Sequence, residues 1–298
     1  MDRSDDEEQG LAPAAAFELV GHEIRAEIVR VLGDARDERS HPAVLSFSEL
    51  RSEIDVDVGS SKFNYHLGQL VGEFVERRDD GYRLRHAGTT LYRTIRARAH
   101  AEGADMGPYD TGLECYHCGS AMEASLTDWG YALACPDCEY VYDWTLVPPG
   151  AATAAGDELR ARLDEYVRHR RRAFVRGVCP ICANGLETRL IDPSEAEYPR
   201  PDLRSVVVNR YCDHCTNLRY LTVGEVLRLR PVVADFFSDR GTDVRATPLW
   251  ELPFAVTDRS TTVRSTDPWE VELAVDCDGD TLTVLADSDL SVVDSRID

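Results

Sequence analysis

The chain has 298 residues, about twice the length of a typical domain, which predicts two or three folded units. Its 54 acidic and 33 basic side chains give a net charge of −21, so composition alone argues against nucleic-acid binding. No apolar run approaches the roughly eighteen residues of a membrane span, and the acidic start lacks the apolar core of a signal peptide. We therefore expect a cytoplasmic protein with no membrane partner.

The acidic balance has a second explanation in the solvent. Lys62 is the only lysine, and acidic residues are spread along the whole chain, which resembles the composition of proteins from extreme halophiles. At about molar ionic strength the Debye length falls to roughly 3 Å, so distant acidic charges barely repel DNA. The net charge is −4 over residues 1–16, −1 over 17–100 and −16 over 101–298, so the first folded unit is nearly neutral.

The first elements are expected to be an acidic tail and two helices. Residues 1–13 are charged, which predicts a disordered tail. Apolar residues at three- and four-residue spacing from Ala14 predict a single helix that ends at Gly33. Ser46 or Ser48 can then cap a short second helix.

A third helix is expected after an acidic turn, with Ser60 as its N-cap. Its buried face is predicted from apolar residues at helical spacing: Phe63, Leu67, Leu70, Val71 and Phe74. Strands over 74–78 and 82–85, joined by an Asp-Gly turn, predict a β-hairpin, and a last helix is expected to end near Gly103. This order of elements is typical of a winged helix-turn-helix domain, here over residues 14–103.

Four runs in this region resemble one known family. They are Leu19-Val20-Gly21-His22-Glu23-Ile24-Arg25, Phe63-Asn64-Tyr65-His66-Leu67-Gly68-Gln69-Leu70, Phe74-Val75-Glu76-Arg77, and Asp80-Gly81-Tyr82-Arg83-Leu84 with Ala87-Gly88. Over residues 17–100 the chain resembles the ArsR-type winged-helix family, most closely a group of haloarchaeal transcriptional regulators with a cysteine-rich C-terminal half. The resemblance implies a DNA-binding regulator. The metal-sensing cysteine motif of the family's namesakes is absent, so metal-triggered release from DNA is not expected.

The third helix is the expected recognition helix, because its polar side chains can hydrogen-bond base edges or phosphates. These side chains are Ser60, Ser61, Lys62, Asn64, Tyr65, His66 and Gln69. Four arginines flank the hairpin and can lie along the minor groove or the backbone: Arg77, Arg78, Arg83 and Arg85. Any amphipathic helix has a polar face, and Tyr65 or His66 can instead cap the core. The order of elements nevertheless favours double-stranded DNA as the partner, bound by a homodimer at a two-fold operator.

Eight of the nine cysteines form four CxxC pairs in two sets. The sets are Cys115, Cys118, Cys135 and Cys138, with sixteen residues between the pairs, and Cys179, Cys182, Cys212 and Cys215, with twenty-nine. Two such pairs complete a tetrahedral zinc site, and the first spacing matches a zinc ribbon. The second set is interpreted as a diverged repeat of the first, so two structural Zn²⁺ ions per chain are expected.

Other cysteine chemistry fits the pattern less well. Disulfides are not expected in a reducing cytoplasm, and four pairs in two sets fit thioredoxin-like chemistry poorly. An iron–sulfur cluster also uses four thiolates and stays open as an alternative. Four cysteines close the zinc shell, and phosphate-loop, HExxH and GxSxG motifs are absent, so no enzyme is expected. His117 and His214, inside two of the pairs, are interpreted as non-ligands.

The remaining chain predicts connecting and terminal elements. Residues 156–176 read as a helix whose arginines either pair with nearby acids, the favoured interpretation, or form a second phosphate-contacting patch. A helix is expected within 223–240 and a hairpin within 269–293. Cys277, outside the pairs, is interpreted as a small buried hydrophobe.

The expected fold class is thus α+β. It comprises an acidic tail (1–13), the winged helix-turn-helix domain (14–103), a first zinc ribbon (104–150), a linking helix (151–178) and a second ribbon with a C-terminal helix and strands (179–298). Sequence-specific DNA binding in transcription regulation is the expected function. Two alternatives stay open: an adaptor whose ribbons bind RNA polymerase or another transcription factor, and a cysteine-based redox or ligand sensor.

Overall fold

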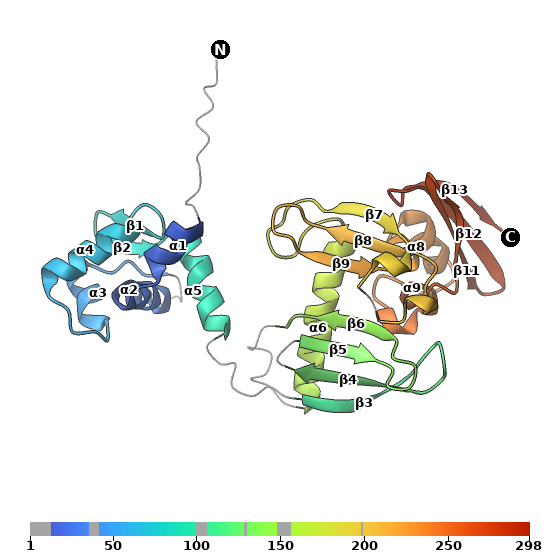
Figure 1. Ribbon diagram of the computed structural model, residues 1–298, viewed down its shortest axis with the longest axis horizontal. Coiled ribbons are helices and arrows are strands. Elements are labelled where there is room, and N and C mark those ends of the chain that lie inside the picture. The colour runs from blue at the N-terminus through green and yellow to red at the C-terminus, as the bar shows by residue number, and fades with distance from the viewer. Residues whose placement is uncertain (1–12, 36–41, 99–105, 128–129, 148–155, 198) are drawn as a thin grey trace, which may run out of the picture. The chain divides into compact units, whose positions relative to one another are not determined.

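The computed structural model describes residues 13–35, 42–98, 106–127, 130–147, 156–197 and 199–298 (Figure 1). The fold is α+β and divides into two compact units, Met1–Ala101 and Glu102–Asp298, each described here by itself. Nearly all of the expected acidic tail lies outside the described residues. Within them, no helix combines the length and apolar character that a membrane crossing requires.

Five helices and a hairpin form the described part of the first unit. They are α1 (Pro13–Val20), α2 (Glu23–Asp34), α3 (Phe47–Glu53), α4 (Ser60–Leu70), β1 (Val75–Arg78), β2 (Gly81–Leu84) and α5 (His86–Arg98). The single helix expected from Ala14 to Gly33 is wrong, because the chain breaks at Gly21 and His22. His22 is extended, and its Nδ1 accepts the N–H of Ile24 at 3.2 Å, so it caps a new helix.

The helix starts are set by local side-chain bonds. Ser46 caps α3 in a capping box, since its Oγ accepts the N–H of Glu49 and the Glu49 carboxylate accepts the N–H of Ser46. Gly59, not Ser60, is the N-cap of α4, and it supplies no side-chain bond. The helix ends at Leu70, which leaves the last two residues of its expected buried face outside it.

After α4, the hairpin and α5 agree closely with the elements expected from the sequence. β1 and β2 pair from Val75↔Leu84 to Arg78↔Gly81. Gly81 is required by a close approach, since a Cβ there would lie 2.2 Å from the carbonyl oxygen of Leu45. The expected end of the last helix near residue 103 lies outside the described residues. The core of this unit joins the helices to the hairpin through Ile24, Ile28, Val29, Val31, Leu32, Leu50, Ile54, Val58, Phe63, Leu67, Leu70 and Val75.

Three antiparallel sheets, each with its strands in chain order, organise the second unit (Figure 1). The first contains β3 (Met106–Glu114), β4 (Ala121–Thr127), β5 (Gly130–Ala134) and β6 (Val141–Thr145). The second contains β7 (Glu187–Ile191), β8 (Val207–Tyr211) and β9 (Leu218–Leu221). The third contains β10 (Thr261–Thr266), β11 (Trp269–Cys277), β12 (Asp280–Ala286) and β13 (Val292–Ile297). The expected terminal hairpin is therefore the centre of a four-stranded sheet.

Helix α6 (Gly156–Val175) joins the first two sheets, as expected of the linking helix. Three of its residues, Leu159, Leu163 and Val167, contribute to the core under the first sheet. Its end contributes Phe174 and Val175 to a second core, shared by the other two sheets. One helix thus belongs to both cores, which makes Glu102–Asp298 a single unit.

Short helices complete the second unit. They are η2 (Pro193–Glu195), η3 (Pro201–Leu203), α7 (Val223–Leu227), α8 (Pro231–Ser238), η4 (Leu249–Glu251) and α9 (Pro253–Val256). The helix expected within 223–240 is two helices, because Pro231 begins the second one. Cys277 is half-buried and packs against the second core, so its burial is only partial.

Candidate metal centres and nucleic-acid interface

The eight paired cysteines form two four-sulfur clusters. In each cluster, the four Sγ atoms all lie within 4.8 Å of one another. The closest sulfurs come from different pairs: Cys115–Cys138 at 3.6 Å, Cys118–Cys135 at 3.4 Å, Cys179–Cys215 at 3.5 Å and Cys182–Cys212 at 3.5 Å. The two sets predicted from sequence are therefore the two sets that the fold brings together.

All four CxxC turns share one backbone design. The N–H of the first cysteine donates to the carbonyl five residues on, and the N–H of the residue four positions on donates back to that cysteine's carbonyl. The eight bonds measure 2.8–2.9 Å. The residue four positions on has a left-handed backbone in every turn: Gly119 (φ 80°), Glu139 (φ 60°), Ala183 (φ 63°) and Thr216 (φ 59°). The design thus recurs although only one of the four residues is glycine.

The sulfur geometry fits a metal ion better than a disulfide. A disulfide needs an S–S distance of about 2.05 Å, whereas a tetrahedral Zn²⁺ with bonds of about 2.3 Å places its sulfurs roughly 3.8 Å apart. The observed separations of 3.4–3.6 Å lie close to the second value. The donor set of four sulfurs also suits a soft or borderline cation.

The thiol ionisation supports the same fit. Backbone and side-chain hydrogen bonds from Ser120 lower the pKa of Cys118 to about 6. Burial opposes ionisation of Cys179, but the N–H groups of Cys182 and Ile181 lower its pKa to about 6. In each cluster another thiol is disfavoured as a thiolate: burial raises the pKa of Cys138 to about 12, and for Cys215 the Asn217 N–H opposes the rise but burial and the neighbouring sulfurs raise the pKa to about 12. Four thiolates at one point therefore need a cation to balance them.

A tyrosine braces the first cluster. The Tyr142 hydroxyl lies 3.3 Å from Cys115 Sγ and accepts the N–H of Tyr116 at 2.9 Å. Burial raises the pKa of Tyr142, so it stays a neutral phenol. Among the described residues, His117 and His214 belong to neither cluster. The centroid of the His117 ring lies 4.3 Å from that of Tyr140, and its buried Nε2 has no hydrogen-bond partner within the part of the chain that the structure describes.

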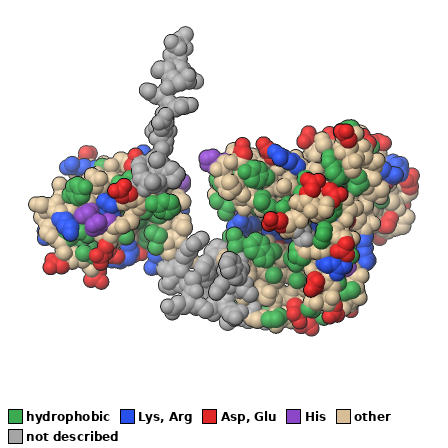
Figure 2. Space-filling view, in the orientation of Figure 1, with side chains coloured by type: hydrophobic (Ala, Val, Ile, Leu, Met, Phe, Trp, Pro, Cys, Tyr) green, Lys and Arg blue, Asp and Glu red, His purple; other side chains and the backbone are tan. Residues whose placement is uncertain are grey.

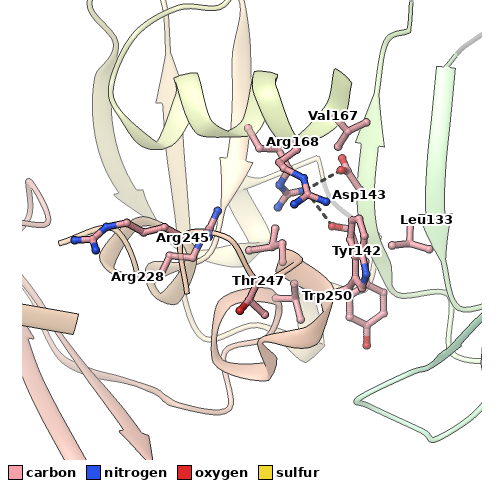
Figure 3. Close-up of a pocket in the computed structure, with 12 residues that line it drawn as sticks. Leu133, Tyr142, Asp143, Val167, Arg168, Arg228, Arg245, Thr247 and Trp250 are labelled. Atoms are coloured by element: carbon pink, nitrogen blue, oxygen red, sulfur yellow. Dashed lines mark hydrogen bonds and ion pairs between the residues drawn. The ribbon is translucent and has the colours of Figure 1, made fainter. Parts of the chain in front are cut away.

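Buried ion pairs connect the strands of the first cluster with those of the second. Asp143 on β6 accepts from Arg171 on α6 at 3.2 Å and from Arg219 on β9. Arg171 also pairs with Glu225 on α7. Asp143 and Tyr142 border a cavity of ≈ 40 Å³, with Arg228 on another side (Figure 3). For Arg171 the favoured interpretation of the basic helix is confirmed, since its guanidinium is held by acidic residues.

Most of the expected DNA-reading side chains lie on one exposed face of α4. The exposed ones are Ser60, Ser61, Lys62, Asn64, Tyr65 and Gln69. His66 is different, because only 4% of it is exposed and its ring packs 4.0 Å from that of His22. A buried ring cannot reach a base edge, so the expectation that His66 contacts DNA directly is wrong.

The hairpin arginines divide into two kinds. Arg78 pairs with Glu76 at 2.7 Å, and Arg83 contacts the same carboxylate, so the two guanidinium groups share one negative charge. Both arginines lower the pKa of Glu76, with Arg83 the larger cause. Arg77 and Arg85 are exposed and form no ion pair with another described residue. They are the two hairpin arginines whose charge stays open to a phosphate.

Sequence reasoning missed Arg51. This residue lies near the end of α3, is exposed, and donates from Nη1 to the Ser60 hydroxyl at 3.3 Å. The contact places a cation beside the first turn of α4, where N–H groups of the helix start favour an anion. The sequence spacing of Arg51 could not predict this contact, because it depends on how α3 and α4 pack together.

The fold and the two clusters define a two-unit α+β chain with paired four-cysteine sites. The chain belongs to a family described as a domain of unknown function, DUF7351, whose model matches residues 112–292 and so spans both clusters. A second model, also described as a domain of unknown function, DUF7347, matches residues 13–95. No curated protein and no solved structure matches the chain significantly.

Proposed function

We propose that this chain is a sequence-specific DNA-binding transcription regulator whose first unit is a winged helix-turn-helix domain. One observation carries the proposal: α4 presents an exposed polar face beside a hairpin flanked by Arg77 and Arg85, which form no ion pair with another described residue. The order of elements from α2 to α5 and the ArsR-type resemblance support it. In this proposal α4 enters the major groove, where Asn64 and Gln69 can each bond an adenine edge through two hydrogen bonds.

We further propose that each cluster holds one Zn²⁺ and that the second unit contains two ribbon-like zinc sites. A closed shell of four cysteines leaves no open position for water, so the role is structural rather than catalytic. The shared backbone design of the four turns and the short distances between the sulfurs of each cluster support this proposal. Low charge near α4, with a net −1 over residues 17–100, lets an acidic chain approach DNA through its first unit. A homodimer at a two-fold site is part of the proposal.

The test is a binding isotherm of the full chain on a duplex enriched from a random-sequence pool and on a scrambled duplex. Asn64→Ala and Gln69→Ala should each cost about 1–3 kcal/mol on the enriched site and relax preference at one base position. The control is Thr90→Ala, an exposed polar residue on α5 that should change neither affinity. Unchanged specificity in both α4 variants would remove this helix from the recognition role. Failure to enrich any sequence would reject the proposed function.

A further inference from the structure

A groove of ≈ 460 Å³ lies in the second unit, between the first two sheets. Its walls are β6 and the residues that follow it, the end of α6, β9, and part of the chain between β7 and β8. Figure 2 shows basic side chains in the hollow between these parts of the unit. The volume falls in the range of small-molecule sites, about 300–1,000 Å³.

One wall of the groove is apolar and accessible. Trp144 is 51% exposed, Leu146 58% and Leu218 47%. All three line the groove, Trp144 from β6, Leu146 just after it, and Leu218 from β9. Large apolar side chains gathered in a concave surface are typical of binding sites rather than of free surface.

Helix α6 contributes a positive charge to the groove. Arg170 lines the groove, donates from Nη1 to the Tyr166 hydroxyl at 2.9 Å, and lies 5.6 Å from the centre of that ring. Among the described residues it has no carboxylate partner. Its neighbour Arg172 on the same helix is exposed and does not line the groove.

A buried ion-pair cluster lies beneath the groove. It holds the guanidinium groups of Arg171 and Arg219 against the carboxylate of Asp143, and Arg171 also pairs with Glu225. Burial lowers the pKa of Arg219, which lines the groove, so its charged form is poorly solvated. A nearby anion would stabilise it. This positive site is set in a region, residues 101–298, whose net charge is −16.

We propose that the groove binds a small organic anion, with its acidic group at Arg170 and its apolar body against Trp144, Leu146 and Leu218. The site is independent of DNA binding by the first unit. The groove is also lined by two carboxylates, Asp143, which is paired with Arg171 and Arg219, and the exposed Glu197, and a small anion can lie at Arg170 without filling the groove. A free carboxylate, sulfonate or phosphate group shares the chemistry that an arginine recognises.

The test uses two fluorescent probes with the same aromatic body. The anion is 8-anilinonaphthalene-1-sulfonate, and the neutral probe is N-phenyl-1-naphthylamine, which lacks the sulfonate. The metal-loaded full chain should bind the anion saturably at one site per chain and about tenfold more tightly than the neutral probe, the size of one charge-assisted hydrogen bond. Equal affinity for both probes, or no saturable binding of the anion, would overturn the proposal.

Matched variants locate the site. Arg170→Ala should weaken the anion about tenfold and leave the neutral probe unchanged, whereas Trp144→Ala should weaken both. Arg172→Ala and Ile297→Ala are the controls, one exposed arginine and one exposed apolar residue outside the groove, and should change neither. All variants should keep the thermal unfolding midpoint and metal content of the unchanged chain. An unaltered anion affinity in Arg170→Ala, or stoichiometric displacement of the anion by a glutamate-rich peptide, would contradict a small-anion site.

Discussion

Arg171 on α6 and Glu225 on α7 form a two-point ion pair inside the second unit, with Nε–Oε1 at 2.8 Å and Nη2–Oε2 at 2.6 Å. Glu225 is 0% exposed, so neither carboxylate oxygen can turn to water. The same guanidinium reaches Asp143 in the middle of β6. One arginine therefore ties the sheet of the first cysteine cluster to the helix that follows the second.

This pair predicts a large and partly reversible effect on stability. Removing one partner of a buried pair costs about 3–5 kcal/mol, because the other charge stays buried and unpaired. Arg171→Met should therefore lower the free energy of unfolding by about that amount, and Arg171→Met with Glu225→Leu should recover part of it. The measurement is chemical denaturation of the metal-loaded chain, with the exposed Arg172→Met as a control within about 0.5 kcal/mol of the parent. A double variant no more stable than Arg171→Met would contradict this account.

The two clusters predict two metal ions per chain. Elemental analysis of protein purified without added metal should give two zinc ions, and Cys115→Ser or Cys212→Ser should each release one. Structural zinc contributes about 10–16 kcal/mol of apparent binding free energy near neutral pH, so losing a cluster should unfold the turns around it. Cys277→Ser is the matched control, because this cysteine lies outside both clusters. Iron in place of zinc, or fewer than one metal per chain, would reject two structural zinc sites.

Features that repeat along the chain were predictable from sequence. The spacing of Phe63, Leu67 and Leu70 predicted which face of α4 is buried, because helical periodicity is a local property. The CxxC pairs predicted both clusters, because a two-residue gap already brings two thiols to one point. In these cases the geometry is determined by residues within one turn or one helix.

Features that depend on contacts between distant segments were not predictable. The apolar pattern continues through His22, so periodicity gave one helix where a single side-chain bond makes two. His66 has a polar side chain, which favoured a surface role, although its spacing from Phe63 and Leu70 places it on the buried face, where its ring packs against that of His22. The pairing of Arg171 with Glu225 joins residues 54 positions apart, and no spacing rule selects that acid among the many in the chain. The metal-ligating cysteines were therefore predictable from the sequence, but the ion pairs and packing contacts around them were not.

The arginines with and without an ion pair to Glu76 should differ in their effect on DNA binding. Arg77→Ala should weaken binding to all sequences about equally and flatten the salt dependence by about one phosphate. Arg83→Ala should do less, because its guanidinium is already held by Glu76. Glu76→Gln should instead strengthen binding to all sequences, since it releases Arg78 and Arg83. Isotherms across a salt series measure this, and an Arg83→Ala effect larger than that of Arg77→Ala would contradict it.

The histidine pair predicts a loss of stability in acid. Burial lowers the pKa of His66 below its ordinary value of 6.5, and the nearby charges of His22, Arg25 and Lys62 act in the same direction. As the pH falls below 6.5, the unfolded chain takes up this proton first, so the contribution is complete above that value and declines below it. His66→Phe should flatten the decline measured by unfolding from about pH 8 to pH 5, whereas the exposed His86→Phe should not. Parallel profiles for His66→Phe and the parent would contradict this.

The left-handed residue of each CxxC turn predicts opposite effects of glycine substitution at two sites. Thr216 is exposed and has φ 59°, a conformation that costs a β-branched residue about 1–2 kcal/mol. Thr216→Gly should therefore raise the free energy of unfolding by up to about 1 kcal/mol, even though glycine loses more entropy on folding. Gly119→Ala, at the corresponding position of another turn, should lower it by about 1 kcal/mol.

The control for this last pair is Thr262→Gly, at an exposed position of β10 with ordinary strand geometry. There the same substitution should destabilise by about 0.5–1 kcal/mol, because only the entropic cost of glycine acts. Chemical denaturation of the metal-loaded chain measures all three variants. If Thr216→Gly destabilises the chain as much as Thr262→Gly does, the left-handed backbone at residue 216 contributes no strain. The positive φ shared by the four turns would then not explain the glycine at residue 119.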